Sequence, residues 1–242
     1  MAHWGAPTRG GAGAPQPRQG NQMTATKAPG AERYLPERRS LDALRAAAEC
    51  CRGCPLFADA TQTVFSRGDS GAPLMLVGEQ PGDQEDRAGE PFVGPAGRLL
   101  ARALEDAGIA PASTYETNAV KHFKFTRKGG KRRIHQKPGR TEVVACRPWL
   151  IAEIEAVRPR VILCLGATAA QSLLGADFRI SAQRGRQVRM PPSAVDVQPD
   201  PIVVATVHPS AVLRDRSDGH DEAYRLFVED LRSARSSVDA NR

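Results

Sequence analysis

Residues 74–83 of this chain read LMLVGEQPGD. The four apolar residues end at Gly78, which is typical of a short buried strand followed by a turn. The turn carries Glu79 and Gln80, and its glycines allow the backbone to approach a ligand closely. It lacks the Gly-Lys-Ser/Thr of a phosphate-binding P-loop, so that class is excluded. Taken alone, the segment also fits a plain turn.

Apolar runs and amphipathic segments alternate along the rest of the chain. We expect further strands over residues 115–120, 161–165 and 202–207, and helices over residues 41–49, 96–107, 141–157, 167–174 and 222–235. Pro148 predicts a bend or break in the third helix, whose apolar face would include Val144. The alternation predicts the α/β class, as a three-layer α/β/α sandwich with a central, mostly parallel, four-stranded sheet. Ligands of such sheets bind beyond the carboxyl ends of the strands.

The composition is that of an ordinary globular protein of 242 residues, 40% hydrophobic and 25% charged. It excludes collagen-like, coiled-coil and wholly disordered chains, and no apolar stretch is long enough to span a bilayer. We expect residues 1–39 to be a disordered, basic, Gly/Pro-rich tail and residues 40–242 to form one domain. Met23 is an alternative start to Met1. No apolar leader is present, so we expect no cleaved secretory signal.

The net charge of +7 is distributed unevenly. Residues 1–40 carry a net +4, and residues 121–140 carry nine basic residues and no acidic one. Subtracting both from the total leaves −6 on the rest of the chain. A basic stretch on an acidic body indicates a polyanion partner such as nucleic acid. A solvated surface loop is the simpler alternative.

Five cysteines are present, at an odd count and wide spacing that argue against a disulfide-stapled secreted protein. We therefore predict a reducing, cytoplasmic location. Cys51 and Cys54 can bind one metal ion or one corner of a cluster, and Cys146 is a candidate third ligand. The fourth could be His122, Cys50 or Cys164. Cys164 lies within an apolar strand and is better explained as a core residue, and a redox pair or plain reduced cysteines are alternatives for the others.

Two histidines lie in segments where a ligand is expected. His208 follows the last predicted strand in the motif His208-Pro209-Ser210, where an imidazole could stabilise negative charge or transfer a proton. A structural histidine is the alternative there. His135 lies inside the basic stretch, in the run Lys131-Arg132-Arg133-Ile134-His135. The cations suit phosphates, so this histidine could approach a sugar.

Together these segments resemble the iron–sulfur uracil-DNA glycosylases of family 4. The resemblance covers about residues 40–235 and rests on ordered motifs: Cys51-x-x-Cys54, Gly78-Glu79-Gln80-Pro81-Gly82, Pro91-Phe92-Val93-Gly94, Thr117-Asn118-Ala119-Val120-Lys121, Cys146 and His208-Pro209-Ser210. The glutamine of the second motif and the run 131–135 are similar to the UdgX branch. UdgX proteins excise uracil and then remain covalently attached to the abasic site. The resemblance implies the α/β/α sandwich fold of uracil-DNA glycosylases.

The resemblance also implies roles for the matching residues. The predicted catalytic residues are Glu79, His135 and His208. The predicted substrate-binding residues are Gln80, Gly82, Asp83, Phe92 and Asn118. Phe92 would stack on the base, Asn118 would hydrogen-bond the uracil edge, and His208 would stabilise the departing uracilate. His135 would then capture the sugar C1′ and form the covalent bond.

DNA contacts and a cofactor complete the expectation. The predicted DNA-binding residues are Lys131, Arg132, Arg133, Ser210 and Arg214. The resemblance implies a [4Fe–4S] cluster held by Cys51, Cys54 and Cys146. The family's usual third cysteine reads His122 here, and we take this histidine as the fourth ligand, with Cys50 as the alternative.

We therefore expect a monomeric protein with no membrane partner that acts on uracil-containing DNA and releases uracil. The DNA would be single-stranded or have the target base flipped out of the stack. Two alternatives stay open. One is an ordinary uracil-DNA glycosylase that turns over, and the other is a non-catalytic, metal-containing DNA-binding protein.

Overall fold

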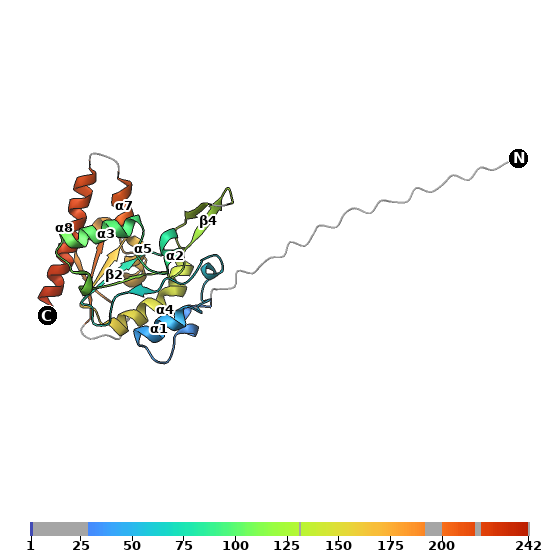
Figure 1. Cartoon of the computed structure of the whole chain (residues 1–242), viewed down its shortest axis with the longest axis horizontal. Helices are drawn as coiled ribbons and strands as arrows, with labels where there is room; N and C mark the ends of the chain where they lie inside the picture. Colours follow the sequence, from blue (N-terminus) through green and yellow to red (C-terminus); the bar gives the residue numbers. More distant parts are fainter. Residues whose placement is uncertain (2–28, 131, 192–199, 216–218, 242) are drawn as a thin grey trace.

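A computed structural model describes Met1 and residues 29–130, 132–191, 200–215 and 219–241. Its main sheet contains β1 (Ser66–Arg67), β2 (Leu74–Gly78), β3 (Thr114–Asn118), β6 (Val161–Leu165), β7 (Gln187–Arg189) and β8 (Ile202–Thr206). The strand order is β1-β3-β2-β6-β8-β7. Figure 1 shows β2 near the middle of the fold, with helices around it. A separate hairpin consists of β4 (Phe125–Lys128) and β5 (Arg132–His135).

The four central strands β3, β2, β6 and β8 are parallel, which confirms the predicted mostly parallel sheet. The predicted number of four strands is too low, because antiparallel β1 and β7 extend the two edges. These edge strands have only two and three residues. Segments that short carry no readable alternation of apolar and polar residues, so the sequence does not reveal them.

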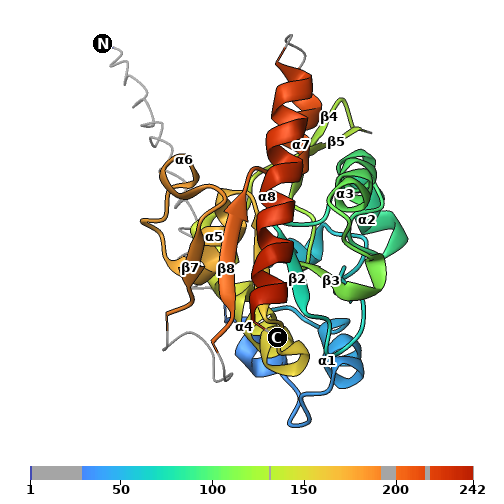
Figure 2. The same cartoon turned by 90° about the vertical axis from the view of Figure 1, so that its left-hand side faces the viewer.

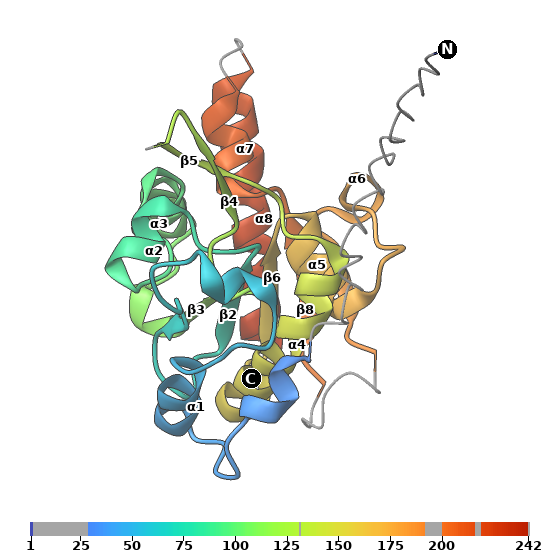
Figure 3. The ribbon, with the colours of Figure 1, turned by 90° about the vertical axis from the view of Figure 1, so that its right-hand side faces the viewer.

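Helices cover both faces of the sheet. The α-helices are α1 (Leu41–Ala48), α2 (Asp83–Ala88), α3 (Pro95–Asp106), α4 (Arg140–Val157), α5 (Ala167–Leu174), α6 (Ile180–Gln183), α7 (Pro209–Arg214) and α8 (His220–Ala240). The short 3-10 helices are η1 (Ala31–Tyr34), η2 (Pro55–Ala58) and η3 (Pro111–Ser113). One face packs on α4 and α5 and the other on α3, α7 and α8, which confirms the three layers (Figures 2 and 3). No helix among these is long and apolar enough to cross a membrane.

The β2 strand illustrates how a central strand packs on both layers of helices. Successive side chains of a strand point to opposite faces. Leu74 and Leu76 therefore pack with the α3 and α8 layer, while Met75 and Val77 pack with the α4 and α5 layer. Because both faces of β2 are buried, apolar residues fill its positions up to Gly78. The equally buried β3 carries polar residues that have partners, since Thr117 donates to the Phe65 carbonyl oxygen and Glu116 pairs with Arg67.

Two expectations about the helices are corrected. The α4 helix continues through Pro148, so the break is wrong, while the predicted bend is not tested. Val144, expected on the apolar face of this helix, is 59% exposed.

The predicted domain boundary at residue 40 is too late. Ala31 in η1 is fully buried and packs in one cluster with Leu44 of α1 and Trp149 of α4. Residues 2–28 of the predicted tail lie outside the described residues. The folded part of the chain therefore includes η1.

Candidate active site

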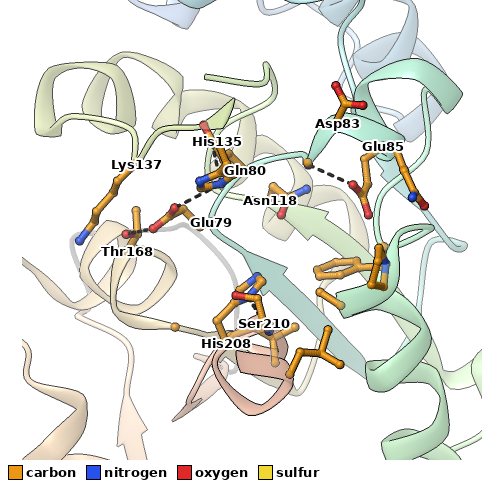
Figure 4. Close-up of a pocket in the computed structure, with 18 of the residues that line it drawn as sticks. Glu79, Gln80, Asp83, Glu85, Asn118, His135, Lys137, Thr168, His208 and Ser210 are labelled. Atoms are coloured by element: carbon orange, nitrogen blue, oxygen red, sulfur yellow. Dashed lines mark hydrogen bonds and ion pairs between the residues drawn. The ribbon is translucent and has the colours of Figure 1, made fainter. Parts of the chain in front are cut away.

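The loops that follow the four parallel strands meet at one cavity of about 880 Å³. The register pairs Gly78 with Asn118 and Leu165 with Thr206, so the carboxyl ends of the strands are level. The chain passes from β3 on one side of β2 to β6 on its other side, which makes this edge a topological switch point. The predicted residues that line the cavity are Glu79, Gln80, Gly82, Asp83, Phe92, Asn118, His135, His208, Ser210 and Arg214 (Figure 4).

The loop that carries Phe92 lines one part of the cavity. Phe92 lies there with φ 56, a left-handed backbone conformation that a bulky residue rarely adopts. A Cβ on Gly97 would lie 1.7 Å from the Phe92 carbonyl oxygen, so only glycine permits this position of the loop. Glu85 secures the loop by accepting hydrogen bonds from the backbone N–H of Gly94 (2.7 Å) and of Gly82 (3.1 Å). Gly97 and Glu85 were not predicted as site residues.

Asn118, at the end of β3, presents its amide beside Phe92. It is 2% exposed, and no hydrogen bond of its side chain occurs among the described residues, so the amide is available to a ligand. The backbone at this position is held by Lys121, whose Nζ donates to the Asn118 carbonyl oxygen (2.9 Å) and pairs with the fully buried Glu153 (2.5 Å). This buried ion pair was not predicted, because its members are 32 residues apart.

His208 begins α7 and faces the cavity as a neutral imidazole. Burial lowers its pKa to about 4, and the neighbouring His135 and Arg214 act in the same direction. Its Nδ1 accepts from the Ser210 backbone N–H (3.1 Å) and lies 2.8 Å from the Ser210 hydroxyl. Since Nδ1 is the acceptor, the ring proton must be on Nε2. His208 can therefore donate one hydrogen bond to a ligand.

Ser210 and Arg214 were predicted to contact DNA. In the structure the Arg214 guanidinium donates to the Ser210 hydroxyl (3.1 Å), which in turn lies against His208. Both residues line the cavity and orient the imidazole.

Glu79 and His135 lie next to each other across the cavity (Figure 4). The His135 Nε2 atom is 3.9 Å from Glu79 Oε1. The other oxygen, Oε2, accepts a hydrogen bond from the Thr168 hydroxyl (2.5 Å). Thr168 was not predicted, although it follows β6 at the same edge of the sheet. The Thr168 bond orients the carboxylate so that one oxygen faces His135.

Gln80, predicted to contact substrate, lines the cavity and also holds the hairpin. Its Oε1 accepts from the Lys124 N–H (3.1 Å), and its Nε2 donates to the Gln136 carbonyl oxygen (2.9 Å). These partners fix which end of the amide is the donor. Nε2 therefore also donates to His135 Nε2 at 2.9 Å. Gln80 holds the base of the hairpin and keeps Nε2 of His135 unprotonated.

Carboxylates from other parts of the fold neutralise several cations of the predicted basic stretch 121–140. Lys121 pairs with Glu153, and Lys124 pairs with Glu142. Arg133, predicted to bind phosphate, is 7% exposed and pairs instead with Asp83 and Asp86. Arg132 is exposed on β5, and Lys131 lies outside the described residues. The carboxylates that neutralise these cations come from α2 and α4 and cannot be recognised in the stretch itself.

Arg133 attaches the hairpin to the body of the protein. Its guanidinium donates to Asp86 (2.6 Å) and to Thr61 (3.0 Å) and lies over the Phe125 ring, 5.1 Å from the ring centroid. Hydrogen bonds from Arg87 and Arg133 hold the pKa of Asp83 below its usual value, although burial opposes this. The predicted substrate residue Asp83 thus lines the cavity but is occupied by these two arginines. His135, two residues after Arg133, is placed by this attachment.

Replacing Arg133 with methionine should lower the free energy of unfolding by about 3–5 kcal/mol, because the fully buried Asp86 carboxylate would lose its cation. Urea denaturation measures this loss. The exposed neighbour Arg132→Met is the matched control and should stay within about 0.5 kcal/mol of the wild type. Adding Asp86→Asn should recover part of the loss. Equal stability of Arg133→Met and Arg132→Met would contradict this account.

Three of the predicted metal ligands lie in one buried cluster. Cys51, Cys54 and Cys146 pack together with Trp149, whose Nε1–H donates to Cys51 Sγ (3.3 Å). The Lys121 N–H donates to Cys146 Sγ (3.3 Å). Burial raises the pKa of Cys54 and raises that of Cys146 to about 12, so these thiols are protonated unless a metal displaces the proton. In the part of the chain that the structure describes, no three His, Cys, Asp or Glu side chains form a site for a single ion.

His122, the predicted fourth ligand, is buried and neutral. Burial lowers its pKa to about 4, against the effect of Asp86. The Thr63 hydroxyl donates to the Ala48 carbonyl oxygen (3.0 Å), so it accepts from His122 Nε2 (2.9 Å). Nδ1 is then the unprotonated nitrogen. Of the alternatives, Cys50 is exposed and Cys164 is a fully buried core residue, as expected.

An amide, an aromatic ring, a carboxylate and two neutral imidazoles line this one cavity, an arrangement suited to holding a flat polar ring and stabilising charge. The chain belongs to the uracil DNA glycosylase superfamily, whose family model matches residues 65–232.

Three curated relatives are similar over most of their length. A type-4 uracil-DNA glycosylase of Thermotoga maritima is 36% identical over 189 residues, which cover 78% of this chain and 89% of the relative. One of Archaeoglobus fulgidus is 37% identical over 178 residues, covering 72% and 83%. One of Pyrobaculum aerophilum is 35% identical over 168 residues, covering 68% and 80%.

Proposed function

We propose that this protein excises uracil from DNA and then bonds covalently to the abasic sugar through His135. The family and the cavity together support uracil-DNA glycosylase activity. The covalent step is carried by one observation, the placement of His135 Nε2 at 3.9 Å from the Glu79 carboxylate. A nucleophilic nitrogen thus lies beside the anion that would stabilise a sugar cation.

Asn118 supplies the selectivity for uracil in this proposal. Its Oδ1 accepts from the N3–H of uracil, and its Nδ2 donates to O4. Cytosine presents the reverse pattern, with an acceptor at N3 and a donor at C4, so it leaves both amide groups unpaired. Phe92 holds the face of the ring.

Breaking the glycosidic bond places negative charge on uracil and positive charge on the sugar. The Nε2–H of His208 donates to the departing uracilate, and its low pKa keeps the imidazole neutral while it does so. Glu79, oriented by Thr168, stabilises the sugar cation. These two side chains act on opposite ends of the breaking bond.

His135 then replaces water as the nucleophile. Its Nε2 lone pair leaves the hydrogen bond from Gln80 and forms a bond with C1′, while the glycosidic electron pair departs with uracil. The imidazolium so formed loses its Nδ1 proton to solvent, and the uracilate takes up a proton. The imidazole also occupies space beside Glu79 that a hydrolytic water would need.

A denaturing gel tests the proposal. The protein is mixed with single-stranded DNA containing one uracil, and with the same DNA containing thymine as control. The uracil strand should give a stable shifted band with release of one uracil for each adduct. Free abasic DNA without the band would indicate an ordinary glycosylase. Salt-sensitive binding without uracil release would indicate a non-catalytic DNA-binding protein.

The rate of adduct formation should be flat from about pH 8 to about pH 6.5 and fall below that, because a protonated imidazole cannot attack C1′. Burial lowers the pKa of His135 below its usual value, while Glu79 opposes this and Arg214 adds to it. Single-turnover rates across this pH series measure the effect. A rate that rises as the pH falls, or that is halved above pH 7, would contradict a neutral His135 nucleophile.

We also propose a [4Fe–4S] cluster on Cys51, Cys54, Cys146 and His122. The irons of a cubane occupy separate corners, so its ligands need not converge as those of one ion do. The N–H donors from Lys121 and Trp149 to two of the sulfurs suit thiolates bound to iron. When bound, the cluster would cross-link the segment around α1 to α4 and take no part in the reaction.

Protein purified in air should be brown and contain about four irons per chain. His122→Ala should lower the iron content, His122→Cys should keep it, and Cys50→Ser should leave it unchanged. Metal analysis and the visible absorption spectrum measure this. Colourless protein with stoichiometric zinc would overturn the cluster. Loss of iron in Cys50→Ser together with full iron content in His122→Ala would identify Cys50, not His122, as the fourth ligand.

A further inference from the structure

A second cavity, of about 440 Å³, adjoins the active-site cavity. Lys137 and Thr168 line both cavities. The second cavity lies between the first half of α4 and α5, which run side by side (Figure 3). The reaction proposed above uses the bond from Thr168 to Glu79 but gives this cavity no role. We call it the flanking site.

The charge of the flanking site differs from that of the active-site cavity. Lys137, Arg140 and Arg147 line it, and its described lining contains no Asp or Glu. The active-site cavity, in contrast, carries Glu79 and two further carboxylates. The flanking site is therefore suited to an anion, on a protein body whose remaining charge is acidic.

The cations at the rim are available to a ligand. Lys137 and Arg140 are exposed, and neither takes part in an ion pair within the described residues, unlike Lys121, Lys124 and Arg133 of the same basic stretch. Arg147 is anchored to α5 through its Nε, which donates to the Ser172 carbonyl oxygen (2.8 Å).

An apolar surface lies among these cations. Val144 lines the flanking site and is 59% exposed, whereas other apolar residues of α4 are buried. Val143 lines the cavity beside it. A nucleotide combines an anionic phosphate with a base face that packs on nonpolar surface. Proteins that bind single strands pair cations with aromatic side chains, and here the valines supply the nonpolar surface beside the cations.

We propose that the flanking site binds the nucleotide next to the target uridine on the same DNA strand. The phosphate lies between Lys137 and Arg140, and the base packs on Val144. Continuity through Lys137 and Thr168 brings the strand directly from the active-site cavity to this nucleotide. The inference rests on the proposed function, because it places the uridine in the active-site cavity.

Binding of single-stranded oligonucleotides tests the flanking site. The target carries 2′-fluoro-2′-deoxyuridine, whose fluorine opposes glycosidic cleavage, so fluorescence anisotropy reports Kd alone. One ligand is the modified uridine nucleotide alone. The other ligands are oligonucleotides that extend it on the 5′ side only, on the 3′ side only or on both sides. Wild-type protein should bind more tightly when the strand is extended on one particular side.

Arg140→Glu and Val144→Glu should each weaken binding of the extended oligonucleotide about tenfold. Binding of the unextended nucleotide should not change. For Arg140→Glu the slope of log Kd against log salt should fall by about 0.7 for each phosphate that the protein no longer neutralises. Arg186→Glu makes the same charge change at an exposed residue beside β7 that does not line the cavity, and it should behave as the wild type.

Other results would overturn the inference. One is an equal loss of affinity for every oligonucleotide in Arg140→Glu and Arg186→Glu, which indicates long-range electrostatics. Another is a wild-type affinity that does not depend on either extension. Uracil release from the ordinary uridine oligonucleotides is measured in parallel. Its absence in wild type refutes the proposed function, whereas normal release without flank dependence refutes only the flanking site.

Discussion

Replacing His135 with serine should abolish the covalent adduct while uracil is still released and abasic DNA accumulates. The change removes the nitrogen that would attack C1′ and leaves a smaller side chain in its place. Asn118, Phe92, Glu79 and His208 keep their positions because none depends on the imidazole for a hydrogen bond in the structure. Water can then enter beside Glu79. Release of uracil should stay within about tenfold of the wild type, because both charge-stabilising groups remain.

The measurement compares adduct on a denaturing gel with uracil released in the same reaction. Lys128→Ser is the matched control, since Lys128 is exposed on β4 of the same hairpin and is not one of the predicted DNA-binding residues. It should form adduct as the wild type does. If His135→Ser forms equal adduct, another nucleophile is responsible. If it yields neither adduct nor free uracil, His135 is needed before the covalent step.

Replacing Gly78 with alanine should lower both uracil release and adduct formation by about a hundredfold or more, because misplacing reacting groups by about 1 Å already costs that much. A Cβ on Gly78 would lie 2.2 Å from Asn118 Oδ1 and 2.9 Å from Cζ of the Phe92 ring. The atoms that would read and hold the base would both have to move. The backbone of β2 itself accepts alanine, since Gly78 does not adopt a positive φ.

Single-turnover kinetics measure this loss, with Gly139→Ala as control. A Cβ on Gly139 would meet only Glu142 Oε2 at 3.5 Å, an ordinary contact. Melting curves should show that Gly78→Ala still folds, with a cost of about 1–3 kcal/mol from overpacking. Normal uracil release by folded Gly78→Ala would refute the proposal that Phe92 and Asn118 bind the base.

The elements that carry long periodic or apolar patterns were predictable. The β6 strand and the α5 helix have the expected bounds, and α1 begins at residue 41 as expected. The site residues at the strand ends were predictable for the same reason. The register of the parallel strands brings Glu79, Asn118 and His208 to one edge of the sheet, and this does not depend on how the helices pack.

Contacts between distant residues could not be read from the sequence. The pairing of Arg133 with Asp86 joins residues 47 positions apart, and the pattern around Arg133 is that of a phosphate-binding loop. Gln80 likewise matches a substrate-binding motif, but its side-chain amide makes hydrogen bonds to the hairpin and the residues beside it. Neither residue carries a local signal of its partner.

The sequence by itself determined the parallel sheet, the edge at which ligands bind and the residue types at that edge, because strand periodicity and strand ends are local properties of the chain. The tertiary structure alone decided which charges remain free. It neutralises Lys121, Lys124 and Arg133 with carboxylates from other elements and leaves Lys137 and Arg140 exposed beside the active site. A charge acts through its neighbours in space, and folding chooses those neighbours.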